Sequence, residues 1–228
     1  MREYISPNKE LMARIPSSKI LKDIYKRLYN KFGRQHWWPG DTAFEVMVGA
    51  ILTQNTSWKN VEKAIKNIDS GKLLDPFKLY GLRDNKLARL IRPAGYYNVK
   101  TRRLKNYLKL FISEYGADVH RMKKMPLAKL RNSLLTVNGI GKETADSILL
   151  YALNRPVFVI DAYTRRFLSR HNLIKRNATY DQLQGLFTRN LPNEAKLFNE
   201  YHALIVRLCK ELCKSKPDCK ECPLYDIL

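Results

Sequence analysis

The sequence predicts an all-α protein, and three observations support this prediction. Apolar residues recur at i, i+3, i+4 and i+7 in several long segments, which is the spacing of one helix face. Glycines and prolines, which end helices, fall between these segments. The strand-like run at residues 157–160 is short and lies between Pro156 and Asp161, so we interpret it as an extended connector. We expect about ten helices.

The expected helices are placed by their caps and apolar faces. Ser17 or Ser18 can cap the first helix, because a serine side chain accepts a hydrogen bond from a first-turn N–H group. Thr179 with Gln182 three residues later is typical of a capping box. Other segments with helical periodicity are residues 44–52, a segment running to about residue 69 that Thr56 or Ser57 can cap, and residues 104–115.

The chain is strongly basic. Its 228 residues include 42 Lys and Arg against 21 Asp and Glu, which gives a net charge of +21. This surplus predicts attraction to a polyanion such as DNA, RNA or a membrane surface. No apolar run approaches the ~20 residues of a membrane span, and the first residues lack a signal peptide, so we expect an intracellular, cytoplasmic protein. The basic stretch of Lys100, Arg102, Arg103 and Lys105 is expected to form a solvated helix face.

Residues 135–144 are the most informative segment. Gly139 and Gly141 precede the start of an amphipathic helix, and glycine permits positive φ and close approach of the backbone to a ligand. The helix start offers free N–H groups and a partial positive charge to a phosphate, and Lys142 adds a full charge. A plain turn between two helices is the alternative for an isolated pair of glycines.

All four cysteines lie close to the end of the chain. Cys209, Cys213, Cys219 and Cys222 have the spacing C-x3-C-x5-C-x2-C. In an intracellular chain such clustering favours a metal site over disulfides. Cys209 and Cys213 are one helical turn apart, so both thiolates can face one centre.

The segment at 135–144, followed by the connector and Asp161, resembles the helix-hairpin-helix and catalytic aspartate of the endonuclease III superfamily of DNA glycosylases. Residues 49–56 resemble its glutamine-bearing helix end, and Cys213, Cys219 and Cys222 resemble its iron–sulfur loop. Residues 37–39, 44–45, 52–56 and 92–98 look most like the branch of endonuclease III-type 3-methyladenine DNA glycosylases. The resemblance covers roughly residues 35–225 and implies a base-excision repair enzyme.

The resemblance also implies two helical lobes. One lobe holds residues 35–154, with the helix-hairpin-helix at about residues 126–151. The other combines residues 1–34 with residues 155–228 and carries the cysteine loop at 209–222. The expected partner is double-stranded DNA with a damaged base, and the enzyme is expected to be a monomer.

Asp161 is the expected catalytic residue. Aspartate is also a preferred N-cap, and both roles are compatible. The dipole of the helix that follows favours the ionised form. An ionised carboxylate can stabilise the positive charge that develops on the sugar, or activate water.

Glu143 departs from part of the family pattern. Family members that also cut the DNA backbone carry a lysine directly before the position of Thr144, and that lysine attacks the sugar. Lys142 lies one residue earlier, about 100° away around the helix, and is expected to face a phosphate instead. We therefore predict a glycosylase without lyase activity, in which Gly139, Gly141, Lys142 and Thr144 contact DNA. The opposing view is that Lys142 swings in as the nucleophile.

The resemblance assigns a base pocket to Trp37 and Phe44 as a stacking pair, with Trp38 as the second choice. Enzymes that act on a base extrude it and hold it between rings. Alkylated purines are cationic, so an aromatic face adds about 1–2 kcal/mol. Glu45 either binds the base or supports the fold. Gln54 is expected to fill the gap left by the extruded base, and a helix-capping role is its alternative. Any of these aromatic residues is also compatible with a core cluster.

The cysteines depart from the family's C-x6-C-x2-C-x5-C pattern. The Cys213 to Cys219 interval is one residue short, and the expected last ligand falls on Leu228. We expect Cys209 to supply the fourth ligand. The resemblance favours a 4Fe–4S cluster, and zinc or metal-free thiols are the alternatives.

Two other functions stay open. One is a glycosylase for mismatched uracil or thymine, or for oxidised pyrimidines with lyase activity. The other is a non-catalytic helix-hairpin-helix module that binds DNA and carries a structural metal.

Overall fold

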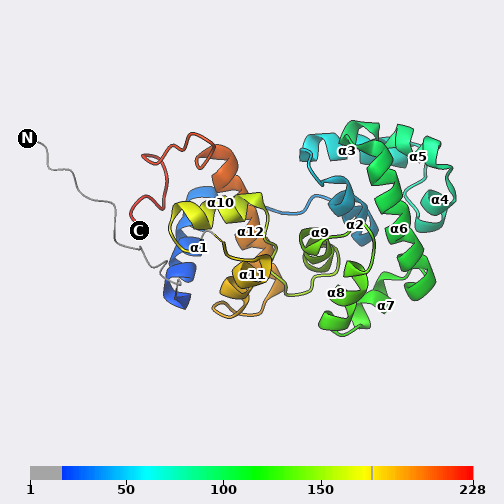
Figure 1. Cartoon of the computed structure of the whole chain (residues 1–228). Coiled ribbons are helices and arrows are strands. Elements are labelled where there is room, and N and C mark those ends of the chain that lie inside the picture. The colour runs from blue at the N-terminus through cyan, green and yellow to red at the C-terminus, as the bar shows by residue number, and fades with distance from the viewer. Residues whose placement is uncertain (1–16, 176, 228) are drawn as a thin grey trace, which may run out of the picture. The chain divides into compact units, whose positions relative to one another are not determined.

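A computed structural model describes residues 17–175 and 177–227 (Figure 1), and every regular element in those residues is a helix. The all-α prediction is therefore confirmed. The predicted connector at residues 157–160 lies within a segment without regular structure, residues 154–161. The elements are α1 (Ser18–Phe32), α2 (Ala43–Leu52), α3 (Trp58–Ser70), α4 (Pro76–Gly81), α5 (Asp84–Leu90), the 3₁₀ turn η1 (Arg92–Ala94), α6 (Tyr97–Tyr115), α7 (Val119–Lys124), α8 (Leu127–Leu135), α9 (Lys142–Ser147), the π-helical turn η2 (Ile148–Ala152), α10 (Ala162–Arg170), α11 (Tyr180–Thr188) and α12 (Ala195–Glu211).

The chain forms two compact units. The hairpin unit contains residues 34–159 and 192–203, and so carries the elements from α2 to η2. Among the described residues, the terminal unit contains 17–33, 160–175, 177–191 and 204–227. Its helices are α1, α10, α11 and the second part of α12.

Helix α2 forms the centre of the hairpin unit. Every residue from Val46 to Leu52 is buried, and a helix that is apolar on all sides is enclosed by its neighbours. Leu104 and Phe111 of α6 and Ile148 of η2 are fully buried in the same unit. Because α2 ends at Leu52 inside this core, the turn that follows it has a fixed starting point.

The terminal unit is built on α1, α10, α11 and α12. Leu21, Ile24 and Leu28 of α1 are fully buried. The serine cap is confirmed, since Ser17 accepts a hydrogen bond from the N–H of Ile20 at 3.4 Å. The capping box of Thr179 and Gln182 at the start of α11 is also confirmed.

The expected solvated face at residues 100–105 is wrong for Lys100, Arg103 and Lys105. The Lys105 side chain is 17% exposed, and its Nζ donates to the carbonyl oxygens of Tyr80 and Leu82. Lys100 is only 1% exposed, and its Nζ donates to the carbonyl oxygens of Leu52 at 2.9 Å and Ala94 at 2.7 Å. The last carbonyl groups of a helix have no partner within that helix, so the buried ammonium satisfies the end of α2. Burial lowers the pKa of Lys100 to about 8. Arg103 is half-buried, whereas Arg102 is exposed as expected.

Candidate active site

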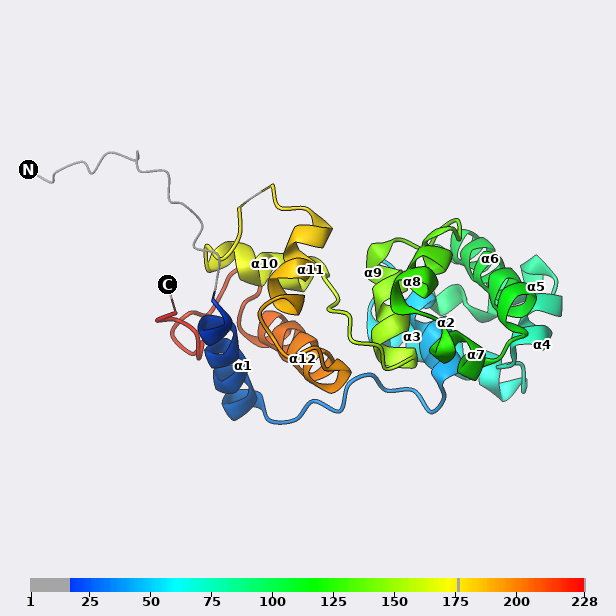
Figure 2. The same ribbon diagram turned by 90° about the horizontal axis from the view of Figure 1, so that it is seen from below.

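The helix-hairpin-helix consists of α8, a turn at residues 136–141, and α9, and α8 and α9 lie side by side (Figure 2). Gly139 has a φ of +98°, which L side chains rarely adopt. A Cβ atom at Gly139 would lie 2.2 Å from Cγ of Arg103, so only glycine lets the turn pass over this side chain. Gly141 is the N-cap of α9, and the exposed Lys142 is its first residue.

A buried ion pair joins the two helices of the hairpin. Arg131 on α8 donates to both carboxylate oxygens of Asp146 on α9, through Nε at 2.7 Å and Nη2 at 3.0 Å. The side chain of Asp146 is 0% exposed. A bidentate pair fixes the orientation of two helices as well as their distance.

Gln54 contacts the hairpin turn. Its Nε2 donates to the carbonyl oxygen of Gly139 at 3.0 Å and to Oγ1 of Thr144 at 2.9 Å. Its Oε1 accepts a hydrogen bond from Nη1 of Arg103 at 2.6 Å. The turn that carries Gln54 is shaped by Asn55 in the left-handed region, at a φ of +53°. The Gln54 amide is therefore held by three hydrogen bonds within the hairpin unit.

Asp161 lies at the N-terminus of α10. It is the N-cap residue, and its Oδ1 accepts a hydrogen bond from the N–H of Thr164 at 2.7 Å. The side chain is half-buried. The expected capping role is thus confirmed, and it orients the carboxylate at the positive end of the helix dipole.

The three residues at the start of α9 differ in exposure. Lys142 and Glu143 are exposed, whereas Thr144 is buried and turned toward Gln54. Glu143 therefore occupies an exposed position in the first turn of the helix that follows the glycines.

Trp38 lies in an aromatic cluster. Its ring contacts Trp37 edge-on at 6.0 Å, Trp58 edge-on at 5.0 Å and Tyr151 in a tilted arrangement at 4.9 Å. The Nε1 atom of Trp38 is buried and finds no hydrogen-bond acceptor among the described residues. Both Trp38 and Trp58 pack against the backbone of Gly49 on α2. The cluster therefore gathers several aromatic ring faces beside α2.

Sequence reasoning missed Trp58 and Tyr151. Trp58 opens α3 four residues after Gln54, and this proximity in the chain was the available signal. Tyr151 lies in the π-helical turn η2, where its hydroxyl is 2.6 Å from Nδ1 of His202. Nothing in the sequence pattern pairs residue 151 with residue 38, because the contact joins distant parts of the chain.

Phe44 and Glu45 lie at the start of α2. The Phe44 ring is 8% exposed and stacks on Phe111 at 6.0 Å, within the core of the hairpin unit. Glu45 accepts a hydrogen bond from the N–H of Asp41 at 3.1 Å, while its own N–H donates to the N-cap Thr42. Both side chains thus make contacts that stabilise this end of α2.

The cysteine loop follows α12 and rests on α10. Arg166 donates to the carbonyl of Cys209 at 2.9 Å. Arg170 Nη1 donates to the carbonyl of Cys213 at 3.1 Å and to its sulfur at 3.2 Å, and Nη2 donates to the carbonyl of Ser215 at 3.0 Å. The neighbouring Cys209 thiol, together with the Arg170 guanidinium, lowers the pKa of Cys213 to about 6.

The four thiols match a four-thiolate group in number and chemistry, but their arrangement fits it only in part. Cys209, Cys213 and Cys222 are buried, and Cys219 is exposed. The Cys209 thiol donates to the carbonyl oxygen of Tyr163 at 3.5 Å, and its electrostatic coupling to Cys213 places the two sulfur atoms near each other. Among the described residues, no three ligand-type side chains converge on one centre. The structure therefore brings two of the predicted ligands together and not the complete set.

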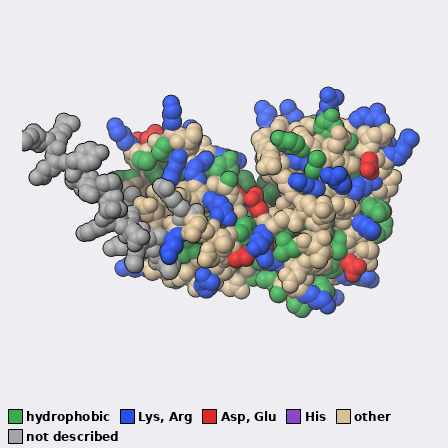
Figure 3. All heavy atoms as spheres, viewed as in Figure 1, with side chains coloured by type: hydrophobic (Ala, Val, Ile, Leu, Met, Phe, Trp, Pro, Cys, Tyr) green, Lys and Arg blue, Asp and Glu red, His purple; other side chains and the backbone are tan. Residues whose placement is uncertain are grey.

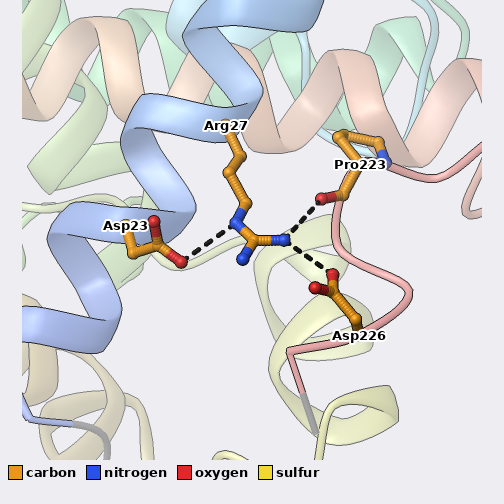
Figure 4. A network of polar contacts seen from close by, with 4 residues as sticks. All are labelled: Asp23, Arg27, Pro223 and Asp226. Atoms are coloured by element: carbon orange, nitrogen blue, oxygen red, sulfur yellow. Dashed lines mark hydrogen bonds and ion pairs between the residues drawn. The ribbon is translucent and has the colours of Figure 1, made fainter.

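The segment after the cysteine loop is anchored on α1 (Figure 4). Arg27 donates to Oδ1 of Asp226 at 2.6 Å and to the carbonyl of Pro223 at 3.4 Å, and it also pairs with Asp23 on its own helix. The loop is thus held at both ends by guanidinium groups, from α10 and from α1.

Lys and Arg side chains are spread over the surface of each unit on the face seen in Figure 3. They supply the positive charge that contact with a polyanion requires. In the part of the chain that the structure describes, no helix has both the length and the apolar character needed to cross a membrane.

Comparison with known proteins identifies a family. Residues 48–193 match the HhH-GPD superfamily of base excision DNA repair proteins. The chain is 50% identical over 211 residues to a Methanocaldococcus jannaschii protein provisionally named a DNA repair glycosylase, covering 92% of this chain and 96% of that protein. It is 30% identical over 186 residues to endonuclease III of Sulfolobus acidocaldarius, covering 80% of each chain.

Solved structures agree with this result. The crystal structure of 3-methyladenine DNA glycosylase MagIII of H. pylori, bound to 1,N6-ethenoadenine, has a TM-score of 0.73 and 29% identity, covering 86% of this chain and 98% of that one. A trapped endonuclease III–DNA covalent intermediate has the same fold, with a TM-score of 0.80 at 20% identity over 93% of this chain and 95% of that one. The chain therefore belongs to the HhH-GPD superfamily of base excision DNA repair proteins, and it is a DNA N-glycosylase.

Proposed function

We propose that this glycosylase removes an alkylated purine of the 3-methyladenine type from duplex DNA, and that it does so by hydrolysis without cutting the strand. The observation that carries the proposal is the cluster of Trp37, Trp38 and Trp58. Electron-rich rings bind a cationic alkylated base more tightly than a neutral one, by about 1–2 kcal/mol.

In this proposal Trp58 takes the stacking role first considered for Phe44. Phe44 is buried and stacks on Phe111, so an extruded base has little access to the faces of its ring. Trp58 contacts Trp38 and is half-buried. The similarity to MagIII, a 3-methyladenine DNA glycosylase, supports the same substrate class.

Asp161 is the proposed catalytic residue. Cleavage of the glycosidic bond leaves positive charge on the sugar, and an ionised carboxylate stabilises this charge or activates the attacking water. An alkylated base is already a good leaving group, so little acid catalysis is required. The hydrogen bond from the N–H of Thr164 holds the carboxylate in one orientation.

The absence of lyase activity is proposed from the start of α9. Glu143 cannot form a Schiff base, and it stands where the lyase members of the family carry their lysine. Lys142, Gly139 and Gly141 are proposed to hold a phosphate of the DNA strand near the lesion. Gln54 is proposed to fill the gap left by the extruded base.

The cysteine loop is proposed to hold a 4Fe–4S cluster, with zinc as the alternative. Cys209, Cys213, Cys219 and Cys222 would be the ligands, and four thiolates suit either group. A bound cluster would crosslink the loop, and we assign no step of base release to it. Iron, sulfide and zinc analysis of the purified protein tests the proposal. Iron and sulfide in about fourfold ratio to protein support the cluster, and absence of iron, zinc and sulfide contradicts any metal site.

Asp161→Asn tests the mechanism with little disturbance of the fold. Asparagine is as good an N-cap as aspartate, so the variant keeps the hydrogen bond to Thr164 and loses the negative charge. We expect base release to fall by roughly 100-fold or more with unchanged stability. Asp75→Asn is the matched control, because Asp75 caps α4 through the same type of bond, from the N–H of Lys78 at 2.9 Å. Equal activity of the two variants would overturn the role of Asp161.

Assays of base release from duplex DNA also distinguish the alternative substrates. Release of thymine or uracil from mismatched duplexes, with no release of alkylated adenine, would favour the mismatch glycosylases. Strand cleavage of DNA that carries an oxidised pyrimidine would favour the lyase branch.

A further inference from the structure

Two cationic side chains of helix α6 donate hydrogen bonds to the segment that joins α2 to α3. Lys100 and Arg103 are three residues apart, so they lie on the same helix face, one turn from each other. Lys100 holds the carbonyl of Leu52, the last residue of α2, and Arg103 holds the side chain of Gln54 two residues later. The turn that carries Gln54 is thus fixed at its beginning and at its centre.

The contacts of Gln54 leave one possible orientation of its amide. The guanidinium of Arg103 only donates hydrogen bonds and therefore faces Oε1. The carbonyl of Gly139 only accepts and therefore faces Nε2. Nε2 also donates to Oγ1 of Thr144, so the amide makes three hydrogen bonds with three different segments of the hairpin unit.

Arg103 also contacts the hairpin directly. Its aliphatic stem lies under Gly139, where a Cβ atom would meet Cγ at 2.2 Å and Cδ at 2.8 Å. One side chain thus supports the backbone of the hairpin turn with its stem and the Gln54 amide with its head group. Removing the head group would let the amide rotate and would free the carbonyl of Gly139.

We propose that Arg103 is a positioning residue that locks Gln54 onto the hairpin turn of the free protein, so that the shape of the hairpin and the availability of Gln54 depend on each other. Insertion of Gln54 into DNA then requires exchange of three hydrogen bonds, and the released guanidinium of Arg103 becomes available to a phosphate. The lock in the free protein is independent of the substrate, whereas its consequence for DNA rests on the proposed function of Gln54.

The first test needs no DNA. The N–H of Ile140 donates to the carbonyl of Val137 at 3.0 Å within the hairpin turn, so hydrogen exchange of this amide reports on the turn. We expect Arg103→Met and Gln54→Leu each to accelerate this exchange about tenfold, and the double variant to add little to either, because both remove the same contact. Arg102→Met is the control, since it removes an exposed cation from the same helix.

Gln54→Glu separates the contact with Arg103 from the contact with the carbonyl of Gly139. Glutamate keeps an acceptor for Arg103 but cannot donate to the carbonyl of Gly139, so exchange at Ile140 should again accelerate. If Arg103→Met does not fold, Arg103→Lys takes its place, because lysine keeps the charge and the stem but lacks the fork of a guanidinium. Exchange at Ile140 that equals the Arg102→Met control, or effects that add in the double variant, would overturn the proposal.

The second test uses duplex DNA with a damaged base. Arg103→Met should change KM and kcat for base release in the wild-type background and should have no further effect in the Gln54→Leu background. A purely structural role of Arg103 would give the same loss in both backgrounds and would overturn the proposal. Because the exchange test is free of DNA, failure of base release in the wild-type protein would count against the proposed substrate and not against the lock.

Discussion

The ion pair between Arg131 and Asp146 gives a prediction whose magnitude follows from the structure. Asp146 is 0% exposed and receives two hydrogen bonds, at 2.7 and 3.0 Å, from one guanidinium. Arg131→Met keeps much of the apolar stem but takes this guanidinium from a buried carboxylate. Removal of one partner of a buried pair costs about 3–5 kcal/mol. Because the pair joins α8 to α9, the hairpin should lose its geometry as well as stability.

Urea unfolding of the wild type and the variant measures this cost. We expect the free energy of unfolding to fall by about 3–5 kcal/mol, and the midpoint of thermal unfolding to fall by roughly 10 °C. Glu211→Gln is the matched control, since its pair with Arg207 is as short, at 2.8 Å, but exposed, and should be worth less than about 1 kcal/mol.

The double variant Arg131→Met/Asp146→Leu completes the test. With both charges gone no buried carboxylate is left without its cation, so most of the lost stability should return. A loss below about 1 kcal/mol for Arg131→Met, or no recovery in the double variant, would refute the assignment of a buried ion pair to this position.

Three further predictions concern other positions. Burial lowers the pKa of Lys100 from 10.5 to about 8, so near and above pH 8 the unfolded chain binds more protons than the folded protein. The free energy of unfolding therefore rises with pH, by about 1 kcal/mol from pH 7 to pH 9. Urea unfolding should show that Lys100→Met abolishes this rise. An identical pH dependence in the variant would contradict this. Gly139→Ala, with a φ of +98° and a clash with Arg103, should cost more than about 1 kcal/mol and weaken binding to duplex DNA in a titration; unchanged binding would contradict the geometry of the turn. Trp58→Ala should raise KM for an alkylated duplex about tenfold while Trp58→Phe keeps most of the affinity, and equal effects of the two would argue against stacking.

Much of the fold could be predicted from the sequence because the relevant signals are local. Ser17 as the first cap, Thr179 with Gln182 as a capping box, and Asp161 as an N-cap follow from residue types at fixed spacing. The hairpin glycines follow from backbone freedom, and Gly139 has the positive φ that this argument requires.

Other positions depend on contacts between distant segments, which the spacing of residues in the chain does not reveal. Lys100 was expected in solvent because charged residues are rarely buried, yet the end of α2 supplies two carbonyl groups nearby. Phe44 and Trp58 are both aromatic residues near Gln54 in the chain, and only the packing of α2 decides which ring lies in the core. Spacing also could not predict that Arg170 of α10 would hold the cysteine loop.

The central claim is hydrolysis of the glycosidic bond of an alkylated base by an enzyme without lyase activity. The most direct measurement is release of base from duplex DNA that carries 3-methyladenine, with strand breaks scored before and after treatment with alkali. We predict free base from the wild-type protein, with strand breaks only after alkali and strongly reduced release by Asp161→Asn. Strand breaks without alkali would show that Lys142 or another amine acts as a nucleophile, and absence of base release would contradict the proposed substrate.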